Sequence, residues 1–220
     1  MTRRRTAAGG GTAVEVAPER LTGWINRFGA RNQGLAGLST DGATIRVRGG
    51  DGTVATLEVP FGPMDVDGAE PVEALLRHLA ALGPLGLILV RGGAHSVGVA
   101  TGGTVDRSST DRAHLQGRTA AGGWSQQRFA RRRGNQRAAS LADAADTAAR
   151  VLGPADGLAG LVLGGDRAAL TAVLADPRLA RLAALPSRTF PDVPEPRRAV
   201  LDEVAARALS VPIVVEPAGA

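Results

Sequence analysis

The sequence predicts a mixed α/β protein with one central sheet flanked by helices, and three observations lead to this fold class. Short apolar runs such as residues 85–90 are typical of buried strands. In the second half of the chain, such runs alternate with segments whose apolar residues recur at helical spacing, as in residues 141–152. The composition is 44% hydrophobic but only 3% aromatic, so the core is built mainly of Ala, Val and Leu.

The N-terminal part is expected to form a basic tail and a small unit. Residues 1–12 are rich in arginine and glycine and show no periodicity, which predicts a disordered tail. Residues 13–66 are predicted to form a small α+β unit. Its helix is expected over residues 18–32, where apolar side chains recur at helical spacing. Its hairpin is expected over residues 43–60, which alternate on both sides of a glycine-rich turn.

Residues 67–220 are predicted to form a larger domain in which strands come first and then alternate with helices. In a helix over residues 125–152, Gly134 is the position at which a break is expected, because an interior glycine costs about 1 kcal/mol relative to alanine. The expected elements are a helix over 70–82, strands over 85–90, 96–103 and 104–110 with a continuation over 112–119, the helix over 125–152, a strand over 157–165, a helix over 167–176, a strand over 182–190, a helix over 196–209 and a proline-ended tail.

The charge of the chain favours an anionic partner such as nucleic acid. The formal net charge is +5, from 26 basic and 21 acidic residues. All the basic residues other than histidine are arginines, and an arginine-rich composition also follows from codon bias, so the distribution of charge is the better evidence. The absence of cysteine excludes a disulfide scaffold and a thiolate metal site.

Positive charge is concentrated in residues 117–137, which contain no acidic residue. On a helix, positions 128, 131, 132 and 135 share one face, so several guanidinium groups can meet a phosphate backbone together. Each phosphate that is neutralised releases counterions, so such binding depends on salt concentration. The alternative is a solvated, arginine-rich helix face. The candidate RNA-binding residues are Arg118, Trp124, Arg128, Arg131, Arg132, Arg133 and Arg137.

The same segment contains residues that suit a catalytic site. Gly122 and Gly123 have no Cβ, which allows the backbone to approach another surface closely. Gln126 and Gln127 offer an amide donor and acceptor but cannot act as general bases at neutral pH. A glutamine can orient a water molecule and, together with backbone N–H groups, stabilise an oxyanion. The alternative is a plain turn followed by the polar first turn of a helix.

The segment GRTAAGGWSQQRFARRR resembles the loop-to-helix segment in the central domain of eukaryotic and archaeal peptide-chain release factors. That segment reads Gly-Arg, then Gly-Gly-Gln, then Arg-Phe-Ala-Arg. Gly117-Arg118 and residues 128–131 match it in order, and the strand in GLAGLVLGGD resembles a later strand of the same domain. The resemblance covers residues 70–215 and implies the mixed, ribonuclease-H-like sheet of that domain.

The sequence departs from that pattern at Trp124, which stands where the catalytic glutamine is expected. Ser125-Gln126 is more similar to the Vms-like release factors, peptidyl-tRNA hydrolases in which a serine separates glycine from glutamine, and the lysine-free composition suits their actinobacterial type. The resemblance implies hydrolysis of the peptidyl-tRNA ester on stalled ribosomal complexes. Gln126 is the first candidate for the catalytic residue and Gln127 the second. Gly122, Gly123 and Ser125 complete the implied catalytic set.

The implied partners are the large ribosomal subunit with its rRNA and peptidyl-tRNA, and we expect a monomer in the cytoplasm that needs no cofactor. Residues 82–90 are too short an apolar stretch to span a bilayer, and no apolar segment follows the basic N-terminus as in a secretory signal. His78, His95 and His114 are isolated from one another, so no metal site is expected.

Two other functions are compatible with the sequence. A non-catalytic ribosome- or RNA-binding module would use the same arginines and would explain the displaced glutamine. A metal-dependent nuclease would use Asp65 and Asp67, which share one face of an extended chain, but no further acids lie at a suggestive spacing. A turn is the simpler interpretation of that segment.

Overall fold

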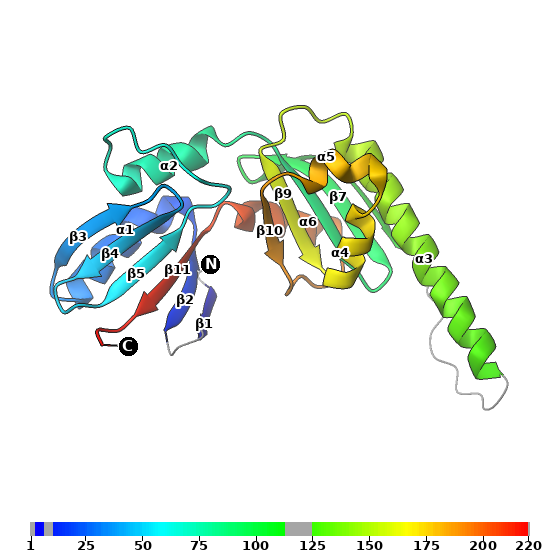
Figure 1. Cartoon of the computed structure of the whole chain (residues 1–220), viewed down its shortest axis with the longest axis horizontal. Helices are drawn as coiled ribbons and strands as arrows, with labels where there is room; N and C mark the ends of the chain where they lie inside the picture. Colours follow the sequence, from blue (N-terminus) through cyan, green and yellow to red (C-terminus); the bar gives the residue numbers. More distant parts are fainter. Residues whose placement is uncertain (1–2, 7–10, 113–124, 220) are drawn as a thin grey trace. The chain divides into compact units, whose positions relative to one another are not determined.

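The computed structural model describes residues 3–6, 11–112 and 125–219, with the backbone alone for residues 3–6 and 125–133. The mixed α/β class is confirmed, but the chain forms two sheets instead of one (Figure 1). The first unit comprises residues 1–82 and 207–220, and the second comprises residues 83–206. The second unit is therefore inserted into the first along the chain.

The first unit contains a six-stranded antiparallel sheet with the strand order β1-β2-β11-β5-β4-β3. The helix and hairpin predicted from the sequence are present as α1 and the β4–β5 pair. Its elements are β1 (Arg3–Thr6), β2 (Thr12–Val16), α1 (Pro18–Arg31), β3 (Leu35–Thr40), β4 (Thr44–Gly49), β5 (Val54–Glu58), α2 (Pro71–Ala81) and β11 (Val211–Glu216).

The expectation of a proline-ended tail after residue 209 was wrong, because residues 211–216 form β11 in the interior of this sheet. β11 pairs with β2 on one side and with β5 on the other, so both of its edges are hydrogen-bonded. Val211 and Ile213 are fully buried against the helices of the unit. Arg207 donates two hydrogen bonds to the carboxylate of Glu15, at 2.6 and 2.9 Å, and so ties the returning chain to β2.

The second unit contains a five-stranded mixed sheet with the order β10-β9-β6-β7-β8. β6 is parallel to β9 and antiparallel to β7. Its elements are β6 (Leu85–Arg91), β7 (Ala94–Thr101), β8 (Thr104–Arg112), α3 (Ser125–Leu152), β9 (Gly160–Gly165), α4 (Arg167–Leu174), a 3₁₀ turn η1 (Pro177–Leu179), α5 (Ala180–Ala183), β10 (Ser187–Phe190) and α6 (Arg198–Ala208).

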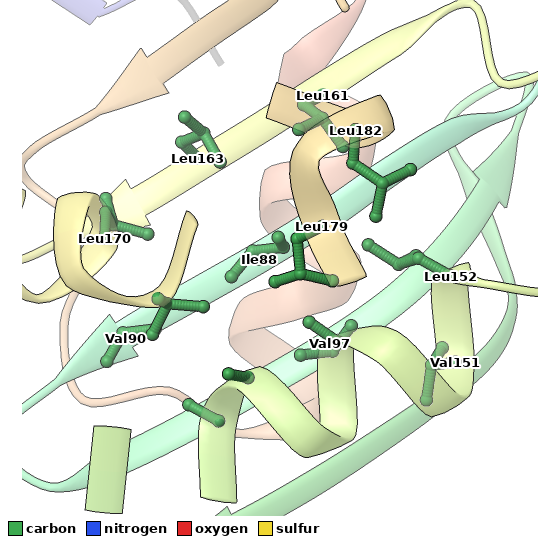
Figure 2. Packing of buried hydrophobic residues seen from close by; sticks show 14 of the residues in the cluster. Ile88, Val90, Val97, Val151, Leu152, Leu161, Leu163, Leu170, Leu179 and Leu182 are labelled. Atoms are coloured by element: carbon green, nitrogen blue, oxygen red, sulfur yellow. The ribbon is translucent and has the colours of Figure 1, made fainter. Parts of the chain in front are cut away.

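Helices cover both faces of this sheet, as the buried runs of β6 and β9 require. α3, α4 and α5 pack on one face, and α6 lies on the other (Figure 2). Ile88, Val97 and Leu179 meet at the centre of the α3 side. The strand expected over residues 182–190 is shorter than predicted, because its first part belongs to α5 and packs Leu182 into this core.

The expected break of α3 at Gly134 was wrong, since the helix is continuous from Ser125 to Leu152. Gly134 is exposed, and its neighbours Arg133, Asn135 and Gln136 are compatible with a helix. The roughly 1 kcal/mol cost of one glycine is offset by continuation of the hydrogen-bonded helix on both sides. At 1.5 Å per residue, the 28 residues of α3 extend for about 42 Å.

Candidate functional site

The candidate site lies at the N-terminal end of α3, which projects past the sheet of its own unit (Figure 1). The first buried residue of α3 in the described part of the chain is Ser140, and residues 134–139 are exposed or half-buried. Position 126 lies 14 residues before Ser140, which corresponds to about 21 Å along the helix axis. Residues 125–139, the N-terminal half of α3, are called the arm below, and the candidate amides lie at its N-terminal end.

The C-terminal part of α3 is packed firmly on the sheet. Ala144, Ala148 and Leu152 are fully buried. The small alanine side chains allow the helix to approach β7 closely, and Thr147 contacts the ring of His95 with 3.1 Å between Oγ1 and Nε2. Arg150 donates to Ser109 Oγ of β8 at 3.0 Å. These contacts make the packed half a rigid base for the projecting half.

Helical periodicity assigns three of the arginine positions to the outer side of α3. With 3.6 residues per turn, positions 128, 131 and 132 lie opposite the packed positions 144, 148 and 151, whereas position 133 is in line with them. Positions 126 and 127 are separated by about 100° around the axis, and position 126 is the one in line with the packed side. The two glutamines thus start from different sides of the first turn.

The net charge of the chain resides in this segment. Residues 117–137 contain six of the 26 basic residues and none of the 21 acidic ones, so the rest of the chain has 20 basic residues against 21 acidic residues. A general excess of arginine would spread the charge instead. The first turn of α3 contains no acidic residue, although acidic side chains are favoured at the positive end of the helix dipole. The end of the arm is therefore suited to an anionic partner.

The structure describes the predicted site residues unequally. Ser125, Gln126 and Gln127 lie in the first turn of α3, and the arginines at positions 128 and 131–133 follow on the same helix. Gly122, Gly123, Trp124 and Arg118 lie outside the described residues, as do His114 and the strand continuation expected over residues 112–119 beyond Arg112. The catalytic and RNA-binding roles of all these residues remain predictions.

Arg137, one of the predicted RNA-binding arginines, has a partner within the protein. Its Nη2 atom lies 3.5 Å from Oδ2 of Asp166, the residue that follows β9. Arg112, at the end of β8, likewise pairs with Glu195 at 3.1 Å. Sequence reasoning missed the partnership of Arg137, because the two residues are 29 positions apart. The only signal was the Gly-Gly-Asp turn itself, which predicts a tight connection.

His95 is a buried titratable group that contacts Thr147 in the packed part of α3. It is 2% exposed, and its Nδ1 atom has no hydrogen-bond partner within the described part of the protein. Burial lowers the pKa of His95, with a smaller contribution from Arg150, while Asp111 and Asp143 oppose the shift. The neutral ring is therefore favoured beneath α3, where it has a structural role.

The other candidate groups do not form a catalytic cluster. Asp65 accepts a hydrogen bond from the backbone N–H of Asp67 at 3.3 Å, as in a turn. Within residues 3–6, 11–112 and 125–219, no three His, Asp or Glu residues gather as a metal site would require. None of the helices described there has the length and apolar character needed to cross a membrane.

Comparison with known families identifies the second unit. The family model of the Actinobacteria/chloroflexi VLRF1 release factor matches residues 83–214, which include the whole second unit and most of β11. The chain belongs to this family. The resemblance expected from the Gly-Arg, Ser-Gln and Arg-Phe-Ala-Arg motifs is thus confirmed. Residues 1–82 of this VLRF1 release factor lie outside the match.

No match was found among the curated proteins. Among solved structures, the crystal structure of the archaeal translation termination factor aRF1 aligns with 90% of this chain at 12% sequence identity and a TM-score of 0.36. The chain spans 66% of the length of that factor, just under two thirds.

Proposed function

We propose that this VLRF1 release factor hydrolyses the ester bond of peptidyl-tRNA on stalled ribosomal complexes in the cytoplasm. The observation that carries the proposal is the position of Gln126 and Gln127 in the first turn of a helix whose N-terminal half projects from the fold. An arm about 20 Å long suits a catalytic group that must reach into a site made by another molecule. Family membership supports the same activity class.

In the proposed reaction, Gln126 holds a water molecule against the ester carbonyl carbon. Water adds to that carbon and the bond to the ribose oxygen of the tRNA breaks. The peptide leaves with a free carboxyl group, and the tRNA regains its hydroxyl group. Because a glutamine cannot remove a proton at neutral pH, groups of the ribosomal RNA handle the protons. The protein alone should therefore hydrolyse free peptidyl-tRNA very slowly.

The arginine face of α3 docks the arm by contact with rRNA and with the acceptor arm of the tRNA. Positions 128, 131 and 132 lie on the side of α3 opposite the packed positions 144, 148 and 151. Gly122 and Gly123 precede the glutamines and would allow the backbone to approach RNA closely. RNA binding and ester hydrolysis are thus assigned to adjacent turns of α3.

A release assay with isolated peptidyl-tRNA–large-subunit complexes tests the proposal. Gln126→Ala should lower the rate of peptide release by at least about 100-fold, the effect of removing one donor to an oxyanion or its water. Gln127→Ala tests the second candidate, since it removes the same side chain from a different side of the helix; if Gln126 is the catalytic residue, this variant should retain most activity. Binding of both variants to the large subunit should match that of the wild type.

The alternative of a non-catalytic binding module makes a different prediction in the same assay. Wild type, Gln126→Ala and Gln127→Ala would then all bind in a salt-sensitive manner, and none would release peptide. That result would contradict the hydrolase proposal. A normal release rate in both single variants would exclude a glutamine of α3 as the catalytic residue.

A further inference from the structure

The turn after β9 is built to hold one carboxylate at the edge of the sheet. Gly165 has φ +105°, and a Cβ atom at this position would overlap the carbonyl oxygen of Val90, so only glycine fits. The backbone N–H of Asp166 donates to that same carbonyl oxygen at 2.8 Å. Asp166 is thereby fixed against the end of the neighbouring strand β6.

Both carboxylate oxygens of Asp166 have partners. Oδ1 accepts hydrogen bonds from the N–H groups of Ala168 at 3.0 Å and Ala169 at 3.3 Å, and so caps α4. Oδ2 faces Nη2 of Arg137 on α3 at 3.5 Å. Because capping already fixes the carboxylate, the ion pair restricts only the arginine side chain and costs less conformational entropy than a pair of two free side chains.

A second contact holds α3 one turn further along. Ser140 is buried and donates from Oγ to the carbonyl oxygen of Gly93 at 3.1 Å. Gly93 lies in the turn after β6, and Asp166 follows β9, which is parallel to β6. Both contacts are therefore made at the same edge of the sheet. The two contacts hold α3 at the point where its buried half ends.

We propose that Arg137 and Ser140 are positioning residues, which fix the direction in which the projecting half of α3 leaves the sheet. The expected effect of these residues on the release rate rests on the proposed function. A rotation of about 5° at Ser140 would move position 126 by about 2 Å, given the rise of the helix. A misplacement of about 1 Å can reduce a rate by about 100-fold. Arg137 then acts through its partner in the protein, not through RNA.

Distance measurement between two spin labels tests the direction of the arm without any ribosome. The chain has no cysteine, so Ala130→Cys on α3 and Ala172→Cys on α4 provide two unique attachment sites. Arg137→Gln and Asp166→Asn each remove the ion pair, and asparagine retains the cap of α4. Each variant, and their combination, should broaden the distance distribution to the same extent, to about twice its width in the wild type or more.

Asp202→Asn is the matched control for these variants. It removes an exposed ion pair with Arg198 within α6, which at 2.9 Å is shorter than the 3.5 Å pair of Arg137 and Asp166, and it should leave the distribution unchanged. Ser140→Ala should also broaden the distribution. Unchanged widths in Arg137→Gln and Asp166→Asn would overturn the inference, and so would broadening in Arg137→Gln alone.

Peptide release separates the positioning role from contact with RNA. In the release assay, Arg137→Gln and Asp166→Asn should lower the release rate by a similar factor, about tenfold, at unchanged affinity for the large subunit. A loss of affinity confined to Arg137→Gln would show that this arginine binds RNA and would overturn the assignment. If the wild type released no peptide, the proposed function would fail, whereas the label distances would still decide the role of Arg137.

Discussion

Among single residues, His95 connects the stability of the second unit to pH. The ring is buried under α3, and its Nε2 atom lies 3.1 Å from Thr147 Oγ1. Because burial lowers the pKa of His95 in the folded state, the unfolded chain takes up a proton first as the pH falls. Protonation therefore favours unfolding, and stability decreases below the ordinary histidine pKa of about 6.5.

We predict that the free energy of unfolding falls between about pH 7 and pH 5, and that His95→Gln reduces this dependence. Urea denaturation at both pH values measures the effect. Asp176 does not contribute in this range, because its pKa lies below 5 in both states: the ordinary value is 3.8, and the hydrogen bond from Arg178 lowers it to about 2 in the folded state. An equally steep dependence in His95→Gln would mean that another group is responsible.

Among single residues, some parts of the candidate site could be predicted from the sequence and others could not. The motif around Gln126 could be identified from local order alone, because its residues are neighbours in the chain. The pairing of Arg137 with Asp166 could not, since it depends on how α3 crosses the end of β9. The same holds for Ser140, whose acceptor Gly93 lies 47 positions away.

Among the elements, α3 leads to the most direct prediction, which concerns Gly134. Gly134 is exposed and helical, and a Cβ atom added there would meet nothing within 4 Å. Gly134→Ala should therefore increase the stability of the second unit by about 1 kcal/mol, the difference in helix propensity. The expected readout is a higher Tm in thermal unfolding, with an unchanged release rate.

Gly98 in β7 provides the contrasting substitution. A Cβ atom there would lie 2.9 Å from the carbonyl oxygen of Arg107 and 2.9 Å from Leu201 of α6. Gly98→Ala should lower the Tm, because backbone atoms must move to make room. If Gly134→Ala also lowered the Tm, the projecting half of α3 would not be helical in solution.

Element prediction from the sequence succeeded where the signal was local. The alternation in β4 and β5 and the apolar runs of β6 and β9 identified those strands. β11 was missed because its partners β2 and β5 lie far away in the chain, and only the complete sheet makes its burial favourable. The sequence therefore predicted the second unit better than the first.

At the scale of the whole molecule, the distribution of charge determines how binding should depend on salt. All the net positive charge lies in residues 117–137, and the remainder is close to neutral. Replacing Arg128, Arg131 and Arg132 together by glutamine should weaken binding to the large subunit. The slope of log affinity against log salt concentration should fall by about 0.7 to 0.9 for each phosphate contact that is lost.

A titration of binding against salt concentration measures that slope. Arg20, Arg27 and Arg31 on α1 provide a control of equal charge, since they lie on one exposed side of a different unit. Their replacement by glutamine should leave the slope unchanged. An equal decrease in both triple variants would indicate that binding follows the total charge of the protein and not the arm.

The placement of β11 has a consequence for synthesis of the protein. The strand occupies an interior position of the first sheet, yet it follows the entire second unit in the chain. During translation, β2 and β5 each have one edge without its native partner until residues 211–216 have left the exit tunnel. All the strands of the second unit have been synthesised by residue 190, so this unit can fold earlier. The first unit, whose synthesis begins first, is therefore completed last.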